Sequence, residues 1–308
     1  MSGLSGLLIA LALAASVQDG AVQTPSEVQA PEVAVPVDDV LVSGRKLRDR
    51  VQSFVDEVAA PTPRRGLARW RDPLCIATAN VDRAVAQPII DHVARVGASY
   101  GLKVREPGCN PNVVIIFTDE APNLAKALVA AEPEAFRVRW TRQLDRGSIA
   151  LSRFQEMDAP VRWWHVSIPV LGWNGKAAIA LPGRGGAPLV PGEGRVNRGR
   201  PVSDQFNKVI IIVDVNRVEG IMLPQLADYL ALVTLAQIDP ESDMQRYDTV
   251  LNVFNNPGAV AGLSEWDRAY LAALYEAHPE RIDRADQATG VTNRLRREEQ
   301  RLAATAPD

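Results

Sequence analysis

The sequence predicts an α+β domain in which helices and strands alternate along the chain. Two fully apolar stretches, residues 113–117 and 209–213, are typical of buried strands. Between and around them, apolar residues recur every three or four positions, which is the spacing of amphipathic helices. With 308 residues and 46% hydrophobic content, the chain can bury one large core or two small ones.

The first half of the domain supplies two helices, two strands and the start of a third helix. Leu47, Val51, Val55 and Val58 mark a helix that Pro61 and Pro63 end. A short strand is expected at residues 75–78, and a buried strand at residues 112–118. Between them, a helix is marked by Val85, Ile89, Val93 and Val96. A further helix is expected to start at Asp119 or Glu120.

The second half is expected to hold three strands and two helices. Strands are predicted at residues 161–168, 177–181 and 208–214, with a hairpin turn at residues 172–175. A helix follows from residue 223, with Pro224 in its first turn and Asp239-Pro240 as its end. Ser264 is expected to cap a last helix, with Asp267 three residues on as a variant of the capping box.

The amino terminus predicts export. Residues 4–15 form an apolar run that is too short to span a bilayer, and small residues follow it, as in a signal peptide occupying residues 1–16. A buried or disordered N-terminal segment is the alternative. We expect a flexible linker at residues 17–43, the domain at residues 44–280, and a charged helical or disordered tail at residues 281–308.

Net charge, apolar stretches and cysteine count limit where the protein can be located and which partners it can bind. The net charge of -3 and the lack of a basic face or module argue against nucleic-acid binding. No other stretch has the roughly 20 apolar residues of a membrane helix, so no membrane span is expected after signal removal. A periplasmic or secreted protein is predicted. Because the only cysteines are Cys75 and Cys109, and an even count in an exported chain favours a bridge, we expect a disulfide.

The helix at residues 226–236 carries the main functional signal. A zinc protease helix needs two histidines at i and i+4 with a glutamate beside the first. This chain has only His92, His165 and His278, and no two of them have that spacing. The helix at residues 226–236 nevertheless belongs to a series of short sequence segments, here called blocks, that follow one another in a characteristic order along the chain. These blocks are residues 70–73, 111–117, 227–231, 250–256, 262–267 and 274–275.

In that order, the blocks resemble a bacterial family of exported, uncharacterised proteins related to zincin-like metallopeptidases. The resemblance implies a zincin-like fold, with a mixed sheet packed against helices that include a degenerate active-site helix. In active members the helix reads His-Glu-x-x-His. Here Ala227 and Ala231 stand at the histidine positions, and only Asp228 retains a carboxylate, so neither a metal nor a cofactor is expected. Asp228 and Tyr229, the polar residues in the core of this apolar helix, are the first catalytic candidates, and His165 is a further one.

A loop dense in glycine and proline, residues 183–200, is the second candidate site. It contains Arg184, Arg195, Arg198 and Arg200, so it is either an anion site or a solvated loop.

Three functions remain open from the sequence. The leading one is a non-catalytic exported protein that binds a peptide or protein partner in the degenerate cleft or has a structural role in the envelope. The second is a hydrolase that combines Asp228 with His165 or His278 and a metal held by carboxylates. The third is an anion-binding protein acting through the arginine loop.

Overall fold

The computed structural model defines a helix-covered sheet, and its described part contains most of the expected domain. The first sixteen residues, the linker and most of the tail lie outside it. The described residues are 49–51, 53–59, 67–138, 146–171, 175–178, 189–190, 194–195, 202–276, 290, 292–294 and 296–297.

The sheet has four strands in the order β1-β2-β6-β3. The pairs β1–β2 and β2–β6 are parallel. Strand β3, at the edge opposite β1, runs antiparallel to β6, so the sheet is mixed. The strands are β1 (Ile76–Ala79), β2 (Val113–Thr118), β3 (Val161–Leu171) and β6 (Val202–Asp214). A separate two-stranded ribbon pairs β4 (Leu189–Val190) with β5 (Gly194–Arg195). Helices with a mixed sheet confirm the predicted α+β class.

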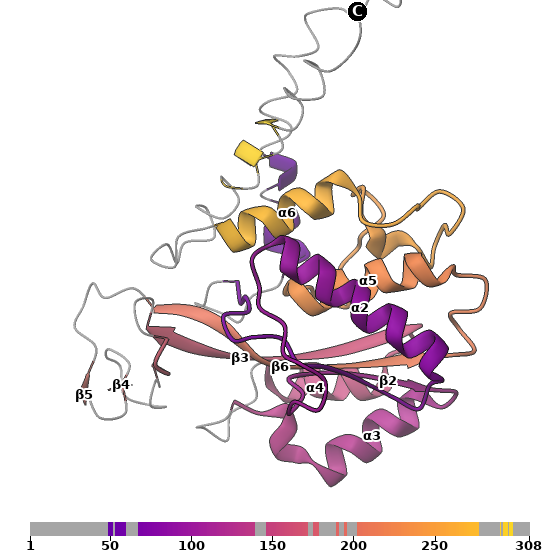
Figure 1. Ribbon diagram of the computed structural model, residues 1–308, viewed down its shortest axis with the longest axis horizontal. Helices are drawn as coiled ribbons and strands as arrows, with labels where there is room; N and C mark the ends of the chain where they lie inside the picture. The colour runs from indigo at the N-terminus through magenta and orange to yellow at the C-terminus, as the bar shows by residue number, and fades with distance from the viewer. Residues whose placement is uncertain are drawn as a thin grey trace, which may run out of the picture.

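Helices cover both faces of the sheet (Figure 1). One face carries α2 (Arg83–Ser99), α5 (Leu223–Leu235) and α6 (Glu265–Glu276). The other carries α3 (Ala121–Ala131), the short helix η1 (Pro133–Phe136) and α4 (Gly147–Glu156). Successive side chains of a strand point to opposite faces, so the sheet separates two cores.

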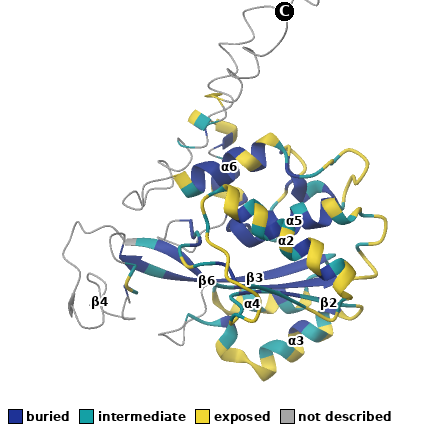
Figure 2. Cartoon of the chain, viewed as in Figure 1, coloured by how far each residue is buried: buried dark blue, intermediate teal, exposed yellow. Residues whose placement is uncertain are grey.

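Strand β3 illustrates this alternation, because its adjacent tryptophans enter different cores. Trp163 belongs to the core beneath α5 and donates its indole N–H to the Ile238 carbonyl at 3.0 Å. Trp164 belongs to the core beneath α3 and α4 and donates to the Phe136 carbonyl at 3.1 Å. Figure 2 shows β3 and β6 buried along the centre of the molecule, while α2 keeps an exposed outer face.

Several local predictions are confirmed. Residues 49–51 and 53–57 are helical and bury the apolar positions from Val51 to Val58, while Leu47 lies outside the described residues. Both reciprocal hydrogen bonds of the α6 capping box are present. The Asp267 N–H donates to the Ser264 hydroxyl at 3.0 Å, and the Ser264 N–H donates to the Asp267 carboxylate at 3.0 Å.

Other boundaries differ from expectation. Helix α5 ends at Leu235, four residues before Asp239-Pro240, because its backbone becomes extended at Ala236. Strand β6 begins at Val202, six residues earlier than predicted, because its polar first half pairs with β3. Of the strand predicted at residues 177–181, only Ala177 and Ala178 are described, and Ala177 forms an isolated bridge with Val170. The sequence pattern did not predict η1 or α4.

The predicted disulfide is present. It joins Cys75, just before β1, to Cys109, just before β2, with a Cα–Cα distance of 6.1 Å. Among the helices that the structure describes, none combines the length and apolar character needed to cross a membrane.

Candidate functional site

Helix α5 is held rigidly by its surroundings. Ten of its 13 residues are buried, so it is a core helix with apolar contacts on nearly every side. The buried Gln225 side chain fastens its first turn: Oε1 accepts from the Met222 N–H at 2.9 Å. Its amide group donates to the carbonyls of Pro257 and Val260. The polar side chains that α5 presents are therefore fixed in position.

Asp228 lies at a junction of α5, α2 and the turn before α6. Its Oδ1 is 2.5 Å from His92 Nε2, and its Oδ2 accepts from the Leu263 N–H at 3.0 Å. The Gly262 backbone packs directly against the carboxylate. A Cβ at this position would lie 2.2 Å from Oδ2, so the close contact requires glycine. The Gly262 φ of +155° adds a second reason for glycine. The carboxylate is thus held from three segments that are distant in sequence.

His92 is a partly exposed side chain on α2. Its Nδ1 is 3.2 Å from an Arg95 guanidinium nitrogen. Because arginine can only donate, Nδ1 accepts this bond, and the ring proton sits on Nε2 and points to Asp228. Each ring nitrogen and each carboxylate oxygen therefore has a partner. An imidazole in this arrangement orients the carboxylate.

The residues around Asp228 do not fit a zinc ion. Ala227 and Ala231 are buried and bear methyl groups at the positions where the resemblance expects ligands. Within the described ranges, no three His, Cys, Asp or Glu side chains are grouped closely enough to hold a metal. Only the Asp228 carboxylate and the His92 imidazole are adjacent there.

His165 lies in the core, apart from Asp228. It donates from Nε2 to the Val233 carbonyl at 2.7 Å, five residues further along α5, and its ring packs against Phe206. Burial lowers the pKa of His165 to about 4, so the ring is neutral at neutral pH. The structure pairs Asp228 with His92 and not with His165. His278, the other histidine of the hydrolase hypothesis, lies outside the described residues.

Tyr229 lines a pocket of about 360 Å³ between α5, the start of β3 and the segment 240–255. Its ring packs edge-on against Trp163 at 6.1 Å and against Phe254 at 4.8 Å. Leu251 and Met244 extend the apolar wall. Burial raises the pKa of Tyr229, so its phenol stays protonated under physiological conditions. We refer to this cavity, with Trp163, Tyr229 and Phe254 as its walls, as the aromatic pocket.

The arginine loop is the predicted site of which only residues 189–190 and 194–195 are described. Arg184, Arg198 and Arg200 lie outside the described residues, as does the side chain of Arg195, whose backbone belongs to β5. Of the hairpin turn predicted at residues 172–175, residues 172–174 also lie outside them, and the described Gly175 donates its N–H to the Leu171 carbonyl at 2.9 Å.

Sequence reasoning proposed Asp228 and Tyr229 but missed their partners. His92 is 136 residues from Asp228, and no local pattern connects them. Phe254 was included only as part of the block at residues 250–256, with no role of its own. Comparison of the chain with protein-family models, curated proteins and solved structures found no match.

Proposed function

We propose that this chain is an exported, non-catalytic protein of zincin-like fold that binds a peptide or protein segment in the aromatic pocket. The observation that carries the proposal is the pocket itself, which opens beside Tyr229 on the helix that the resemblance identifies as a degenerate active-site helix. The disulfide between Cys75 and Cys109 supports export, because such bridges persist in oxidising compartments.

The aromatic pocket is suited to one apolar anchor side chain. Three aromatic rings supply rigid walls, and Met244 supplies an adaptable one. Binding energy in protein interfaces concentrates in such desolvated pockets, which take an aromatic or aliphatic anchor from the partner. Glu241 and Asp243 line the pocket as well. Glu241 is paired with Arg153, so Asp243 is the carboxylate that favours a basic residue beside the anchor.

Addition of a strand to the β3 edge of the sheet is the less suitable mode of binding. It requires an accessible backbone along β3. Residues 161–166 are each at most 4% exposed, so a new strand would first have to displace whatever covers them. Insertion of a side chain into the aromatic pocket requires no such rearrangement.

The environment of Asp228 supports a non-catalytic role for this residue. Metal activation of water requires ligands, and Ala227 and Ala231 supply none. Both oxygens of Asp228 are already hydrogen-bonded, to His92 and to the Leu263 backbone. These contacts favour a structural role for the carboxylate.

Selection of short random peptides displayed on phage against the purified protein tests the proposal. We expect enriched peptides to share an apolar anchor, and Phe254→Ala to weaken their binding by about tenfold or more. Ile149→Ala is the matched control, because Ile149 is 71% exposed on α4, across the sheet. Peptides that bind both variants and the wild type equally would place recognition elsewhere and reject the pocket.

A hydrolase remains the second candidate, and the 2.5 Å contact between His92 and Asp228 is the observation that favours it. Elemental analysis of wild type and Asp228→Ala, dialysed without chelator, separates the two. Zinc near one per chain that falls in the variant, together with degradation of casein, would support the hydrolase. Absence of stoichiometric metal and of proteolysis would support the binding protein.

A further inference from the structure

The Tyr229 hydroxyl differs from every other tyrosine hydroxyl of the chain. All five tyrosines lie within the described residues, so their hydroxyl groups can be compared. Three of them donate to a described acceptor at 2.7–3.4 Å, namely those of Tyr100, Tyr247 and Tyr275. The Tyr270 hydroxyl has no partner and is fully enclosed. The Tyr229 hydroxyl has no partner among the described residues and is not enclosed, so it opens into the aromatic pocket that Tyr229 lines.

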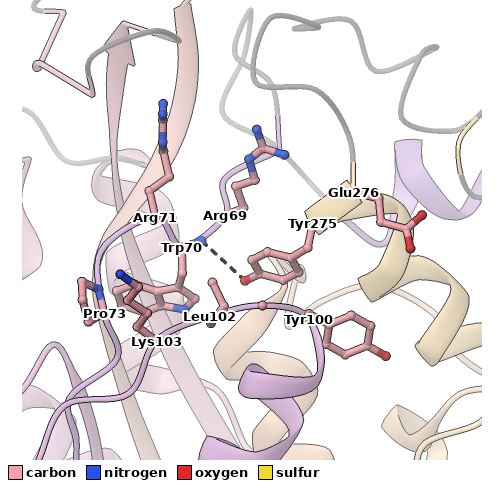
Figure 3. Close-up of a pocket in the computed structure, with 10 residues that line it drawn as sticks. Arg69, Trp70, Arg71, Pro73, Tyr100, Leu102, Lys103, Tyr275 and Glu276 are labelled. Atoms are coloured by element: carbon pink, nitrogen blue, oxygen red, sulfur yellow. Dashed lines mark hydrogen bonds between the residues drawn. The ribbon is translucent and has the colours of Figure 1, made fainter.

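A larger cavity, of about 550 Å³, provides the contrast (Figure 3). Arg69 and Arg71 line it, but both guanidinium groups already donate to backbone carbonyls, at 3.1 Å and 3.5 Å. Tyr275 lines it as well, and its hydroxyl also accepts from the Trp70 N–H at 3.4 Å, which is the dashed line in Figure 3. These three side chains are engaged within the protein, whereas the Tyr229 hydroxyl is available to a ligand.

The surroundings of the Tyr229 hydroxyl make its hydrogen bonding decisive for binding. Tyr229 is only 6% exposed, and its ring is held edge-on by Trp163 and Phe254. Within the described part of the chain, solvent alone can hydrogen-bond to the hydroxyl of the free protein. A purely apolar anchor that displaced this water would leave the hydroxyl without a partner, which is unfavourable. An anchor with a hydrogen-bonding group avoids that cost.

The charge of the aromatic pocket lies at its rim. Asp243 is exposed, and its Oδ1 accepts from the Gln245 N–H at 3.0 Å, which orients the carboxylate. No cationic side chain of the described residues pairs with Asp243, whereas Glu241 is paired with Arg153. The aromatic walls of the interior are uncharged. This distribution favours a neutral anchor inside the pocket and a cation beside it at the rim.

From these observations we propose that the anchor is a tyrosine side chain, with a basic residue next to it in the partner segment. The inference rests on the proposed function, because it requires the aromatic pocket to bind a peptide segment. The phenol ring packs against the rigid aromatic walls, and either hydroxyl can donate to the other. Phenylalanine offers the same ring without this bond. A lysine anchor would place its charge among uncharged walls, away from the exposed Asp243.

Paired peptides test the tyrosine anchor on the full-length protein. From the peptides selected on phage, those whose binding is lost in Phe254→Ala are synthesised with either tyrosine or phenylalanine at the anchor position. By fluorescence anisotropy, we expect the tyrosine form to bind the wild type about tenfold more tightly. Both forms should bind Tyr229→Phe equally. Tyr100→Phe is the matched control and should keep the preference, because Tyr100 does not line the pocket and its hydroxyl donates to the Arg268 carbonyl.

Folding and the basic neighbour are checked separately. Tyr229→Phe should leave the urea midpoint unchanged, because the hydroxyl that it removes has no partner among the described residues. Asp243→Asn should weaken a peptide with lysine beside the anchor by about fivefold and reduce the salt dependence of its binding. Asp91→Asn, on the exposed face of α2, is the control for this change and should leave the affinity unaltered.

The outcomes separate this inference from the proposed function. Equal affinity of the two peptide forms for the wild type would overturn the tyrosine anchor and leave the aromatic pocket as a peptide site. A preference that persists in Tyr229→Phe, or selection of aliphatic or cationic anchors in place of tyrosine, would overturn it as well. If no selected peptide depends on Phe254, the pocket and the tyrosine anchor are both rejected.

Discussion

Removal of the Asp267 carboxyl is expected to destabilise the protein strongly. Asp267 is fully buried beneath the first turn of α6. Its carboxylate accepts from the Thr249 hydroxyl at 2.6 Å, the Val250 N–H at 2.8 Å and the Ser264 N–H at 3.0 Å. Asp267→Ala leaves these donors without their acceptor at about 1–3 kcal/mol each, so we expect a loss of roughly 3–5 kcal/mol.

The same group predicts a pH dependence with a definite sign. Burial outweighs the donated hydrogen bonds and raises the pKa of Asp267 to about 6, from 3.8 in the unfolded chain. The folded state therefore binds the proton more tightly. The stabilisation from this group is fully present below about pH 4 and is lost as the pH rises to about 6. The difference corresponds to about 3 kcal/mol, at 1.36 kcal/mol per pKa unit.

Urea unfolding of wild type and Asp267→Asn, followed by circular dichroism between about pH 4 and pH 7, measures this effect. The asparagine keeps one acceptor oxygen but does not titrate, so the stability difference between the two proteins isolates the carboxyl. We expect this difference to shift by about 3 kcal/mol in favour of the variant as the pH rises. A constant difference across the range would refute the reasoning.

Four further perturbations concern the Asp228 junction and the disulfide. Gly262→Ala places a methyl group against Asp228 Oδ2 and should lower the free energy of unfolding by about 1–3 kcal/mol, whereas an unchanged urea midpoint would contradict the close contact. Asp228→Ala should cost roughly 1–3 kcal/mol and His92→Ala at most about 1 kcal/mol, since the Leu263 N–H loses its acceptor only in the former. The opposite order in chemical denaturation would show that the imidazole holds the junction. Reduction of the bridge between Cys75 and Cys109, which are 34 residues apart, should cost about 3–4 kcal/mol, and equal melting temperatures with and without reductant would argue against this.

Much of the fold was predictable because its signals are local. The apolar run of β2 and the helical spacing of α2 each depend on residues that are near one another in sequence. The Ser264 cap of α6 spans three residues and forms as predicted. Helix α4 was missed because it has a single fully buried residue, Phe154, which leaves almost no apolar stripe in the sequence.

The candidate sites were less predictable. Asp228 and Tyr229 were identified from their place in an apolar helix, but their environments come from elsewhere in the chain. Trp163 and Phe254 reach Tyr229 from β3 and from the segment after η2 (Val250–Asn252). The cavity lined by Arg69, Arg71 and Lys103 left no sequence signal, because these residues are isolated charges in separate segments.

The sequence by itself determined most of the strands and helices around the sheet and the pairing of its two cysteines, because each depends on composition or on neighbours within a few residues. Only the tertiary structure decided that His92 meets Asp228, that Tyr229 faces a pocket and that Arg69, Arg71 and Lys103 share a cavity. The physical reason is that these contacts arise where separate elements pack together. Burial, charge and hydrogen bonding at such junctions depend on long-range packing that no short sequence window contains.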